Sequence, residues 1–296
     1  MEAEDQKIIP FLWFDGKVED AVNFYTSTFK NGKILSMHRA GNGMPGEKGD
    51  VFTSTFQLAG LEFYALNGGP QFKFTPAISF FVNCETGEEI DSLWKKLSEG
   101  GMALMPLDKY LFSQKFGWIQ DKFGLSWQLN FTGSEQKITP FLMFVKEQNG
   151  KAEEAMNLYT SLFKNSSILR VSHYGAGERG TEGTVNHAAF SLEGEQFMAM
   201  DSNMDHQFTF TPATSFFVNC YTQEEVDFFW EKLSEGGKKD RCGWLVDKCG
   251  VSWQIVPTAL GKLMYDKDPV KSARVMQAMM KMDKLIIKDL EEAYNQ

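Results

Sequence analysis

The chain has 296 residues, 43% of them apolar, so it can bury a substantial core, and its length suggests about two domains. Its formal charge of −9 comes from acids scattered along the chain without any basic stripe, which argues against nucleic acid and anionic membranes as partners. No run approaches 18 apolar residues and the polar start MEAEDQK is unlike a signal peptide, so we expect a cytoplasmic protein whose cysteines are reduced.

An internal repeat defines the organisation of the chain. Segments between residues 7 and 129 return in the same order between 137 and 255, namely KIIPFLWF, AVNFYTSTFKN, FKFTPAISFFVNCET, LWKKLSEGG and GWIQDKFGLSWQL. Each copy must bury its apolar faces within itself or against its twin. The repeat predicts a first domain at 1–134, a second domain at 135–258 and a helical C-terminal tail at 259–296.

Each copy predicts two smaller units of similar order. The first unit begins with the apolar run from Ile8 to Phe14, which is followed by a helix and then by strand-like segments at about 34–39, 51–58 and 61–67. The helix between them carries an apolar stripe: Val18, Ala21, Val22, Tyr25 and Phe29. This stripe returns in the second copy.

The second unit begins with the strand AISFFVNC. Thr86 and Glu89 form a capping box that starts a helix, which Gly100-Gly101 then ends. Alternating strands follow around an Asp-Lys-x-Gly turn. The predicted fold class is therefore α+β, with the order strand, helix and three strands used four times.

The copies differ at one long segment. Copy one carries an extra stretch from Met102 to Phe116 where copy two has only KKDRC. Tyr110 and Phe112 in this stretch are candidates for a lid over a ligand, and a surface elaboration without function is the alternative.

The tail predicts a helix that starts at Asp268-Pro269. Val270, Ala273, Met276 and Met280 form its apolar stripe, which we expect to pack across a sheet or between protomers. A methionine box that contacts a ligand is the alternative.

At these motifs the chain resembles a known family. A strand, an acidic helix carrying Asn-Phe-Tyr (23–25) or Asn-Leu-Tyr (157–159) and a closing Asp-Lys-x-Gly-x-Ser-Trp-Gln strand resemble the PhnB-like branch of the vicinal oxygen chelate superfamily, which includes glyoxalase I, bleomycin-resistance proteins and extradiol dioxygenases. The resemblance covers roughly residues 7 to 257. It implies tandem glyoxalase-like domains, in which four βαβββ modules form two cup-shaped, eight-stranded sheets.

Metal-dependent members of this superfamily hold a divalent ion with one His or Glu from each of four strands. The resemblance places Pro10, Tyr64, Ala77 and Gln128 at these positions in copy one, and Pro140, Met198, Ala213 and Gln254 in copy two. Apolar side chains and a lone carboxamide do not supply the ligand set of a catalytic metal. We therefore expect neither a metal nor another cofactor, and no catalytic residue is assigned.

Strand alternation aims other side chains into the cups. The predicted cup-lining, ligand-binding residues are Tyr64, Ser79, Phe81, Gln128, His187, Ser215, Phe217 and Gln254. Aromatic walls with a few polar groups are typical of a small-molecule pocket. The alternative is that these polar groups only bond one another inside a tight barrel. The remaining histidines, His38, His173 and His206, are expected to be solvated or locally hydrogen-bonded.

Two other motifs indicate no chemistry. Gly175 to Gly180 spells the dinucleotide fingerprint, but strand-like residues follow it where a phosphate-binding loop would open a helix, so it predicts a hairpin connection. Members of the family are sometimes labelled ubiquinone methyltransferases, yet the sequence contains no Rossmann-like loop for a methyl donor. Cys242 has no adjacent base and is expected to be an inert, partly buried thiol.

These observations favour a protein that binds a small, partly aromatic or amphipathic molecule in a cup without the superfamily metal. The alternative is a lyase, isomerase or dioxygenase-like enzyme that uses a displaced metal or acid–base chemistry near His187. The duplication predicts either a monomer that is a fused dimer or a homodimer. We also hypothesise that only one cup binds, while its twin supports the structure.

Overall fold

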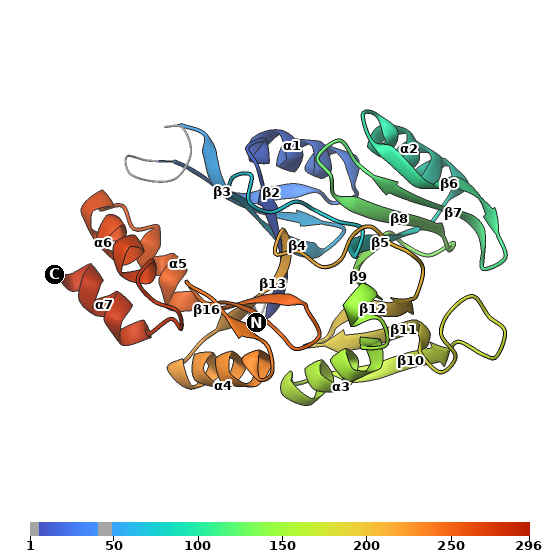
Figure 1. Ribbon diagram of the computed structural model, residues 1–296. Helices are drawn as coiled ribbons and strands as arrows, with labels where there is room; N and C mark the ends of the chain where they lie inside the picture. The colour runs from blue at the N-terminus through green and yellow to red at the C-terminus, as the bar shows by residue number, and fades with distance from the viewer. Residues whose placement is uncertain (1–5, 41–48) are drawn as a thin grey trace.

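The computed structural model describes residues 6–40 and 49–296, which form two eight-stranded sheets flanked by helices (Figure 1). The sheet that we call the first cup has, from edge to edge, the order β14 (Lys238–Lys239), β15 (Trp244–Val246), β16 (Ser252–Pro257), β13 (Thr214–Cys220), β1 (Ile8–Phe14), β4 (Leu61–Asn67), β3 (Val51–Leu58) and β2 (Lys33–Arg39). The second cup has the order β10 (Ser167–His173), β11 (Val185–Leu192), β12 (Glu195–Ser202), β9 (Lys137–Val145), β5 (Ile78–Cys84), β8 (Ser126–Phe131), β7 (Ser113–Gln120) and β6 (Met102–Tyr110).

The helices confirm the predicted units. Each module contributes one: α1 (Val18–Thr28), α2 (Gly87–Ser98), α3 (Ala152–Leu162) and α4 (Gln223–Ser234). The capping box starts α2 as expected, because Thr86 Oγ1 accepts from the Glu89 amide at 3.1 Å while Glu89 Oε2 accepts from the Glu85 amide at 2.6 Å. None of the helices among the described residues is long and apolar enough to span a bilayer.

Both cups are built from both copies of the repeat. β1 pairs antiparallel with β13, with Ile8 opposite Val218, and β5 pairs antiparallel with β9, with Ile78 opposite Leu142. Each sheet therefore joins one module of copy one to one module of copy two. The grouping of four metal positions within a single copy is wrong for this reason.

The cores on the helix side, in contrast, follow the copies. Side chains of α1 and α2 share one apolar cluster with copy-one strands, including Tyr25, Phe56 and Trp127. Copy two forms a second cluster around Tyr159 and Trp253 under α3 and α4. In Figure 1, α1 and α2 lie on one side of the molecule and α3 and α4 on the other. Each core is thus formed mainly by one copy, with Ile138 added to the first cluster and Ile8 and Ile78 to the second, whereas each sheet is formed by two modules from different copies.

The Asp-Lys-x-Gly motif has a structural role. The buried carboxylate of Asp121 accepts hydrogen bonds from Tyr25 Oη and Trp127 Nε1, both at 2.8 Å, and from the backbone amides of Phe123 and Leu125. Asp247 repeats this arrangement in copy two with Tyr159 and Trp253. The motif thus ties the helix tyrosine to the turn and to the last strand of its own copy.

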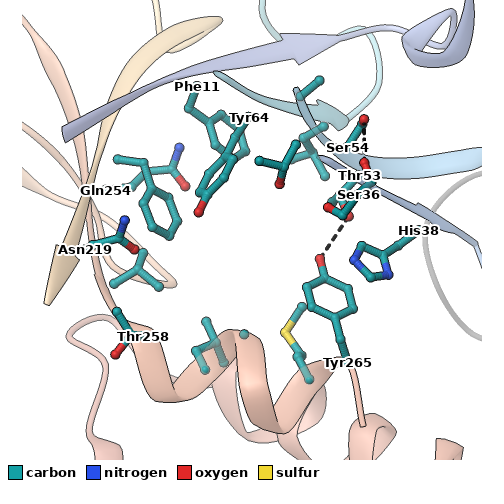
Figure 2. Close-up of a pocket in the computed structure, with 18 of the residues that line it drawn as sticks. Phe11, Ser36, His38, Thr53, Ser54, Tyr64, Asn219, Gln254, Thr258 and Tyr265 are labelled. Carbon is teal, nitrogen blue, oxygen red and sulfur yellow. Dashed lines mark hydrogen bonds between the residues drawn. The ribbon is translucent and has the colours of Figure 1, made fainter. Parts of the chain in front are cut away.

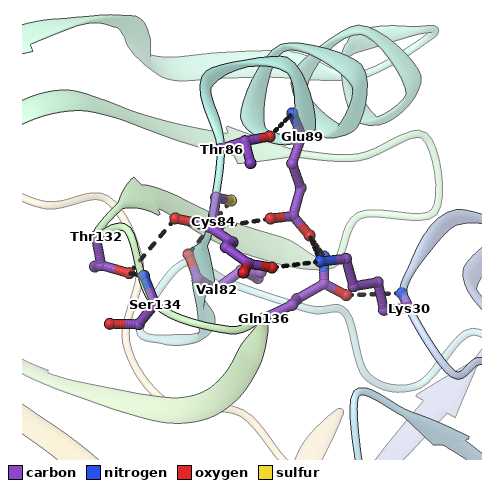
Figure 3. A network of polar contacts seen from close by, with 9 residues as sticks. Lys30, Val82, Cys84, Thr86, Glu89, Thr132, Ser134 and Gln136 are labelled. Atoms are coloured by element: carbon purple, nitrogen blue, oxygen red, sulfur yellow. Dashed lines mark hydrogen bonds and ion pairs between the residues drawn. The ribbon is translucent and has the colours of Figure 1, made fainter.

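The linker between the copies is held by the side chain of Gln136 (Figure 3). Its Oε1 accepts from the Lys30 amide at 2.7 Å, and its Nε2 donates to Glu89 Oε1 at 2.8 Å. Lys30 Nζ also pairs with Glu89 and with Glu85, at 3.2 and 3.1 Å. Because Gln136 is only 6% exposed, these bonds fix the path of the chain from β8 to β9.

The tail forms three helices, α5 (Thr258–Met264), α6 (Pro269–Met279) and α7 (Ile287–Asn295). Asp268 caps α6 by accepting from the amides of Val270 and Lys271, as the Asp-Pro signal predicts. The predicted stripe is wrong, because Val270 and Met280 are 62% and 55% exposed whereas Ser272 and Val275 are buried. Val275 packs instead with Leu260, Leu285 and other tail residues.

The extra segment of copy one is regular structure. Residues 102–116 lie mostly in β6 and the start of β7, which pair as an antiparallel hairpin. In copy two the equivalent strands are short, and the amides of Cys242 and Gly243 donate to the tail carbonyls of Met282 and Asp283 at 2.8 and 2.7 Å. The tail thus supports the edge of the sheet that lacks a long hairpin.

Candidate functional site

A cavity of about 520 Å³ lies between the concave face of the first cup and helix α5 (Figure 2). Strands β1 to β4 supply one part of its wall, and β13, β15 and β16 supply another. Thr258, Leu260, Met264 and Tyr265 close it from the tail. The cavity is therefore built by the first module, the last module and the C-terminal tail together.

Aromatic rings form the apolar wall of the cavity. Phe217 meets Tyr64 edge to face with centroids 4.9 Å apart, and Phe11 meets Trp244 in the same way at 5.7 Å. Phe11 and Phe217 lie nearly parallel at 6.4 Å. Such rings offer faces and edges to a flat guest.

Polar groups interrupt this wall on both sides. Gln254 and Asn219, 4% and 7% exposed, lie on the neighbouring strands β16 and β13. Gln254 Nε2 donates to Ser215 Oγ at 3.0 Å. Ser36, Thr53 and Thr55 add hydroxyl groups from β2 and β3 on the other side.

His38 and Tyr265 meet at the boundary between the sheet and the tail. Their rings stack with centroids 3.8 Å apart, and Tyr265 Oη lies 2.9 Å from Thr53 Oγ1. Desolvation lowers the pKa of His38, so its ring is neutral at pH 7 and able to accept a proton.

The structure divides the residues predicted to line a cup. Tyr64, Phe217 and Gln254 line the cavity, and Ser215 lies beside it as the partner of Gln254. The other four, Ser79, Phe81, Gln128 and His187, belong to strands of the second cup. Gln128 Nε2 donates to Ser79 Oγ at 2.8 Å, so the two cups repeat one Gln–Ser pair.

Large side chains fill the second cup. Phe141, Met143, Val145 and Met198 form a buried cluster against Phe81, Trp118, Met200 and Phe208. His187 is half-buried beside Phe141, with ring centroids 6.0 Å apart, and its Nδ1 lies 3.4 Å from Arg170 Nη2. Desolvation, with a smaller effect of Arg170, lowers the pKa of His187. The predicted inward orientation of His187 is consistent with this packing, but His187 lies in the second cup, next to this packed cluster, and not on the cavity wall.

The candidate lid residues lie away from the cavity. Tyr110 and Phe112 stack at 5.5 Å near the turn of the β6–β7 hairpin, and both contact Phe116 on β7 of the second cup. Phe112 is 69% exposed. Neither residue lines the cavity, which α5 and Tyr265 close instead.

The residues at the superfamily metal positions do not fit a divalent ion. Pro10 and Pro140 lie opposite Phe216 and Phe80, which belong to the helix-side cores, so the concave positions are Phe11 and Phe141, one residue further along. Tyr64 and Met198 lie beside these phenylalanines. Within residues 6–40 and 49–296, no group of three His, Cys, Asp or Glu side chains is placed to hold a metal.

Several cavity residues were not predicted. His38 was expected to be solvated or locally bonded, but it lines the cavity. Thr55 lies opposite Tyr64 in the sheet, and Thr53 faces the same side of β3, so the alternation of side chains along β3 was the available signal. Trp244 and the tail residues Met264 and Tyr265 carried no comparable signal, because their position depends on how the tail folds back.

The structure also places the glycine-rich motif and Cys242. Gly175 to Gly180 lies in the connection between the antiparallel strands β10 and β11. Cys242 is half-buried on the cavity wall, and desolvation raises the pKa of its thiol.

Comparisons with known proteins agree with this architecture. The family model described as 3-demethylubiquinone-9 3-methyltransferase matches residues 6–130 and again residues 136–256. A PhnB protein from Bacillus cereus is 50% identical, covering 43% of this chain and 100% of its own, with a TM-score of 0.42. Glyoxalase I from Zea mays, 13% identical, covers 83% of this chain and 92% of its own with a TM-score of 0.53, which shows a shared fold. No curated protein matches the chain. Because the family model matches both copies and covers most of the sequence, the protein belongs to the PhnB-like family of the vicinal oxygen chelate superfamily.

Proposed function

We propose that the protein binds a small, partly aromatic or amphipathic molecule in the cavity of the first cup, without a metal of the superfamily type. The observation that carries this proposal is the contrast between the cups. One encloses about 520 Å³ and the other is occupied by methionine and aromatic side chains. Ligand pockets typically measure about 300–1,000 Å³ and are mostly apolar with a few placed polar groups.

The duplication supplies a matched test of this function. Gln254→Leu changes the open cup, and Gln128→Leu makes the same change in the filled cup. Both carboxamides are buried and bonded to an equivalent serine, so the two variants should lose similar stability. We expect a screen of aromatic compounds, read by thermal shift, to find ligands whose affinity falls about tenfold in Gln254→Leu and stays unchanged in Gln128→Leu.

Equal effects of the two substitutions on affinity would contradict the proposal. Metal analysis of the purified protein is the companion measurement, since stoichiometric zinc, nickel or iron would favour the enzyme alternative.

An acid–base enzyme is the second candidate, and one observation favours it. His38 is the histidine that lines the cavity within the described residues, and its lowered pKa keeps the ring unprotonated at pH 7, which is the form that a general base needs. If the protein turns over a bound molecule, His38→Gln should abolish turnover and retain binding. Retained turnover in this variant would exclude His38 as the base.

We further propose that the chain acts as a monomer equivalent to a fused dimer, since both sheets are completed within one chain. Light scattering after size-exclusion chromatography tests this state. The cytoplasmic location stays a prediction.

A further inference from the structure

We infer that the molecule bound in the first cup is an aromatic compound that presents an O–H or N–H donor to Asn219 and Gln254. This inference rests on the proposed binding function and specifies the chemical class of the ligand. It follows from two buried carboxamides on one wall of the cavity (Figure 2).

The orientation of Asn219 is fixed by its partner. Its Nδ2 donates to the backbone carbonyl of Gln6 at 2.8 Å, and a carbonyl oxygen only accepts, so the amide cannot be turned round without losing this bond. Asn219 Oδ1 is the group that remains. Among residues 6–40 and 49–296, no donor bonds this oxygen, and it is not one of the side-chain atoms that are sealed from solvent without a partner, so it is open to the cavity.

Gln254 offers a second acceptor on the adjacent strand. Its Nε2 donates to Ser215 Oγ at 3.0 Å. No donor from the described part of the chain bonds its Oε1, which is likewise not sealed from solvent. Gln254 lies opposite Phe217 in the ladder, and Asn219 follows Phe217 by two residues on the same face of β13. The two carbonyl oxygens therefore belong to one small region of the wall.

An acceptor that faces a cavity without a donor from the protein can take a hydrogen bond from a bound molecule. The apolar part of this wall is formed chiefly by the rings of Phe217, Tyr64 and Phe11. A flat ring would pack against such rings, and a hydroxyl or amino group on it would reach the carboxamides. An anionic group would meet the negative ends of two carbonyl dipoles and is disfavoured there.

The experiment compares two probes that differ by one donor, 4-phenylphenol and its methyl ether, 4-methoxybiphenyl. Binding is measured by quenching of tryptophan fluorescence, since Trp244 lines the cavity. We expect the wild type to bind the phenol about tenfold more tightly than the ether. Asn219→Leu should reduce this preference to less than about threefold by weakening the phenol alone.

Controls come from the other copy and from the ether. Asn83 occupies the equivalent position on β5, in the filled cup, so Asn83→Leu should keep the full preference. The affinity of the ether reports whether each variant retains a folded cavity. Should Asn219→Leu fail to fold, Gln254→Leu provides the same comparison.

The outcomes separate this inference from the proposed function. Equal affinity of both probes for the wild type, with binding lost when Thr55→Trp fills the cavity, overturns the donor inference and leaves the cavity as a binding site. A preference that survives in both Asn219→Leu and Gln254→Leu also overturns it. If neither probe binds, or if Thr55→Trp binds both as well as the wild type does, the proposed function fails with it.

Discussion

The rings of Tyr265 and His38 stack face to face, with centroids 3.8 Å apart and 12° between their planes. Together with the hydrogen bond between the hydroxyl groups of Tyr265 and Thr53, this stack connects the tail to strands β2 and β3 across the mouth of the cavity. The rest of the tail is anchored on the opposite side, where Gln223 bonds the backbone of Leu285 and Ile287. Tyr265 therefore holds the tail against β2 and β3, on the side away from the Gln223 anchor.

We predict that Tyr265→Ala accelerates ligand exchange. The substitution removes both the ring stack and the hydroxyl, while the anchors at Leu285 and Ile287 stay intact. Association and dissociation rates, measured by stopped-flow fluorescence, should both rise by about tenfold or more, with a smaller change in affinity. Tyr265→Phe, which keeps the stack, should lie between this variant and the wild type. Unchanged rates in Tyr265→Ala would show that ligands enter elsewhere.

A second prediction concerns pH. Desolvation holds the pKa of His38 below its ordinary value of 6.5. As the pH falls below 6.5, the unfolded chain takes up a proton that the native state does not, so this residue makes stability decrease on acidification. The loss in melting temperature between pH 7.5 and 5.5 should be smaller in His38→Gln than in the wild type. Parallel melting profiles for the two proteins would contradict the assignment.

The family motif should affect stability and leave binding unchanged. Tyr25→Phe and Tyr159→Phe each remove one donor from a buried carboxylate, Asp121 or Asp247. We expect each substitution to lower the free energy of unfolding by about 1–3 kcal/mol in urea titrations, with unchanged ligand affinity. Tyr110→Phe is the control, because its exposed hydroxyl bonds only the Pro106 carbonyl, and it should cost less than about 0.5 kcal/mol. A loss of affinity without a loss of stability would assign these tyrosines to the site.

Thiol labelling tests the environment of the cysteines. Burial raises the pKa of Cys84, Cys220 and Cys249 to about 12, so at pH 8 only roughly one in ten thousand of each is a thiolate. Iodoacetamide should therefore modify the native protein slowly and at Cys242, as read by peptide mass spectrometry. Because Cys242 lines the cavity, a bound ligand should slow its modification. All four should react after unfolding in urea, and rapid native labelling of Cys84 would refute the burial argument.

Local structure was largely predictable because it is encoded locally. The apolar periodicity of 18–29 and the capping box at Thr86 and Glu89 gave α1 and α2, and the Asp268-Pro269 pair gave the start of α6. The choice of partner modules was not predictable. Since the copies are nearly equivalent in sequence, β1 has the same kind of apolar edge to offer to β5 or to β13.

The presence of a cavity in the first cup also depends on side-chain packing that sequence periodicity does not reveal. Tyr64 in the first cup corresponds to Met198 in the second, and each lies next to a phenylalanine of the central strand, Phe11 or Phe141. Whether such a cup closes depends on rotamers and on what covers it. The prediction of the buried stripe on α6 was wrong for a related reason, because packing against α5 and α7 determines which side of α6 is buried.

The exchange of modules between the two sheets makes the halves of this chain interdependent. Copy one alone would hold most of one helix-side core and two half-sheets, with the edges of β1 and β5 left without their partners β13 and β9. Strand edges with unpaired N–H and C=O groups tend to pair with a strand of another chain. Fragments 1–134 and 135–296, produced as separate polypeptides, would thus be obligate complements, and a reporter split at this junction would record their reassembly.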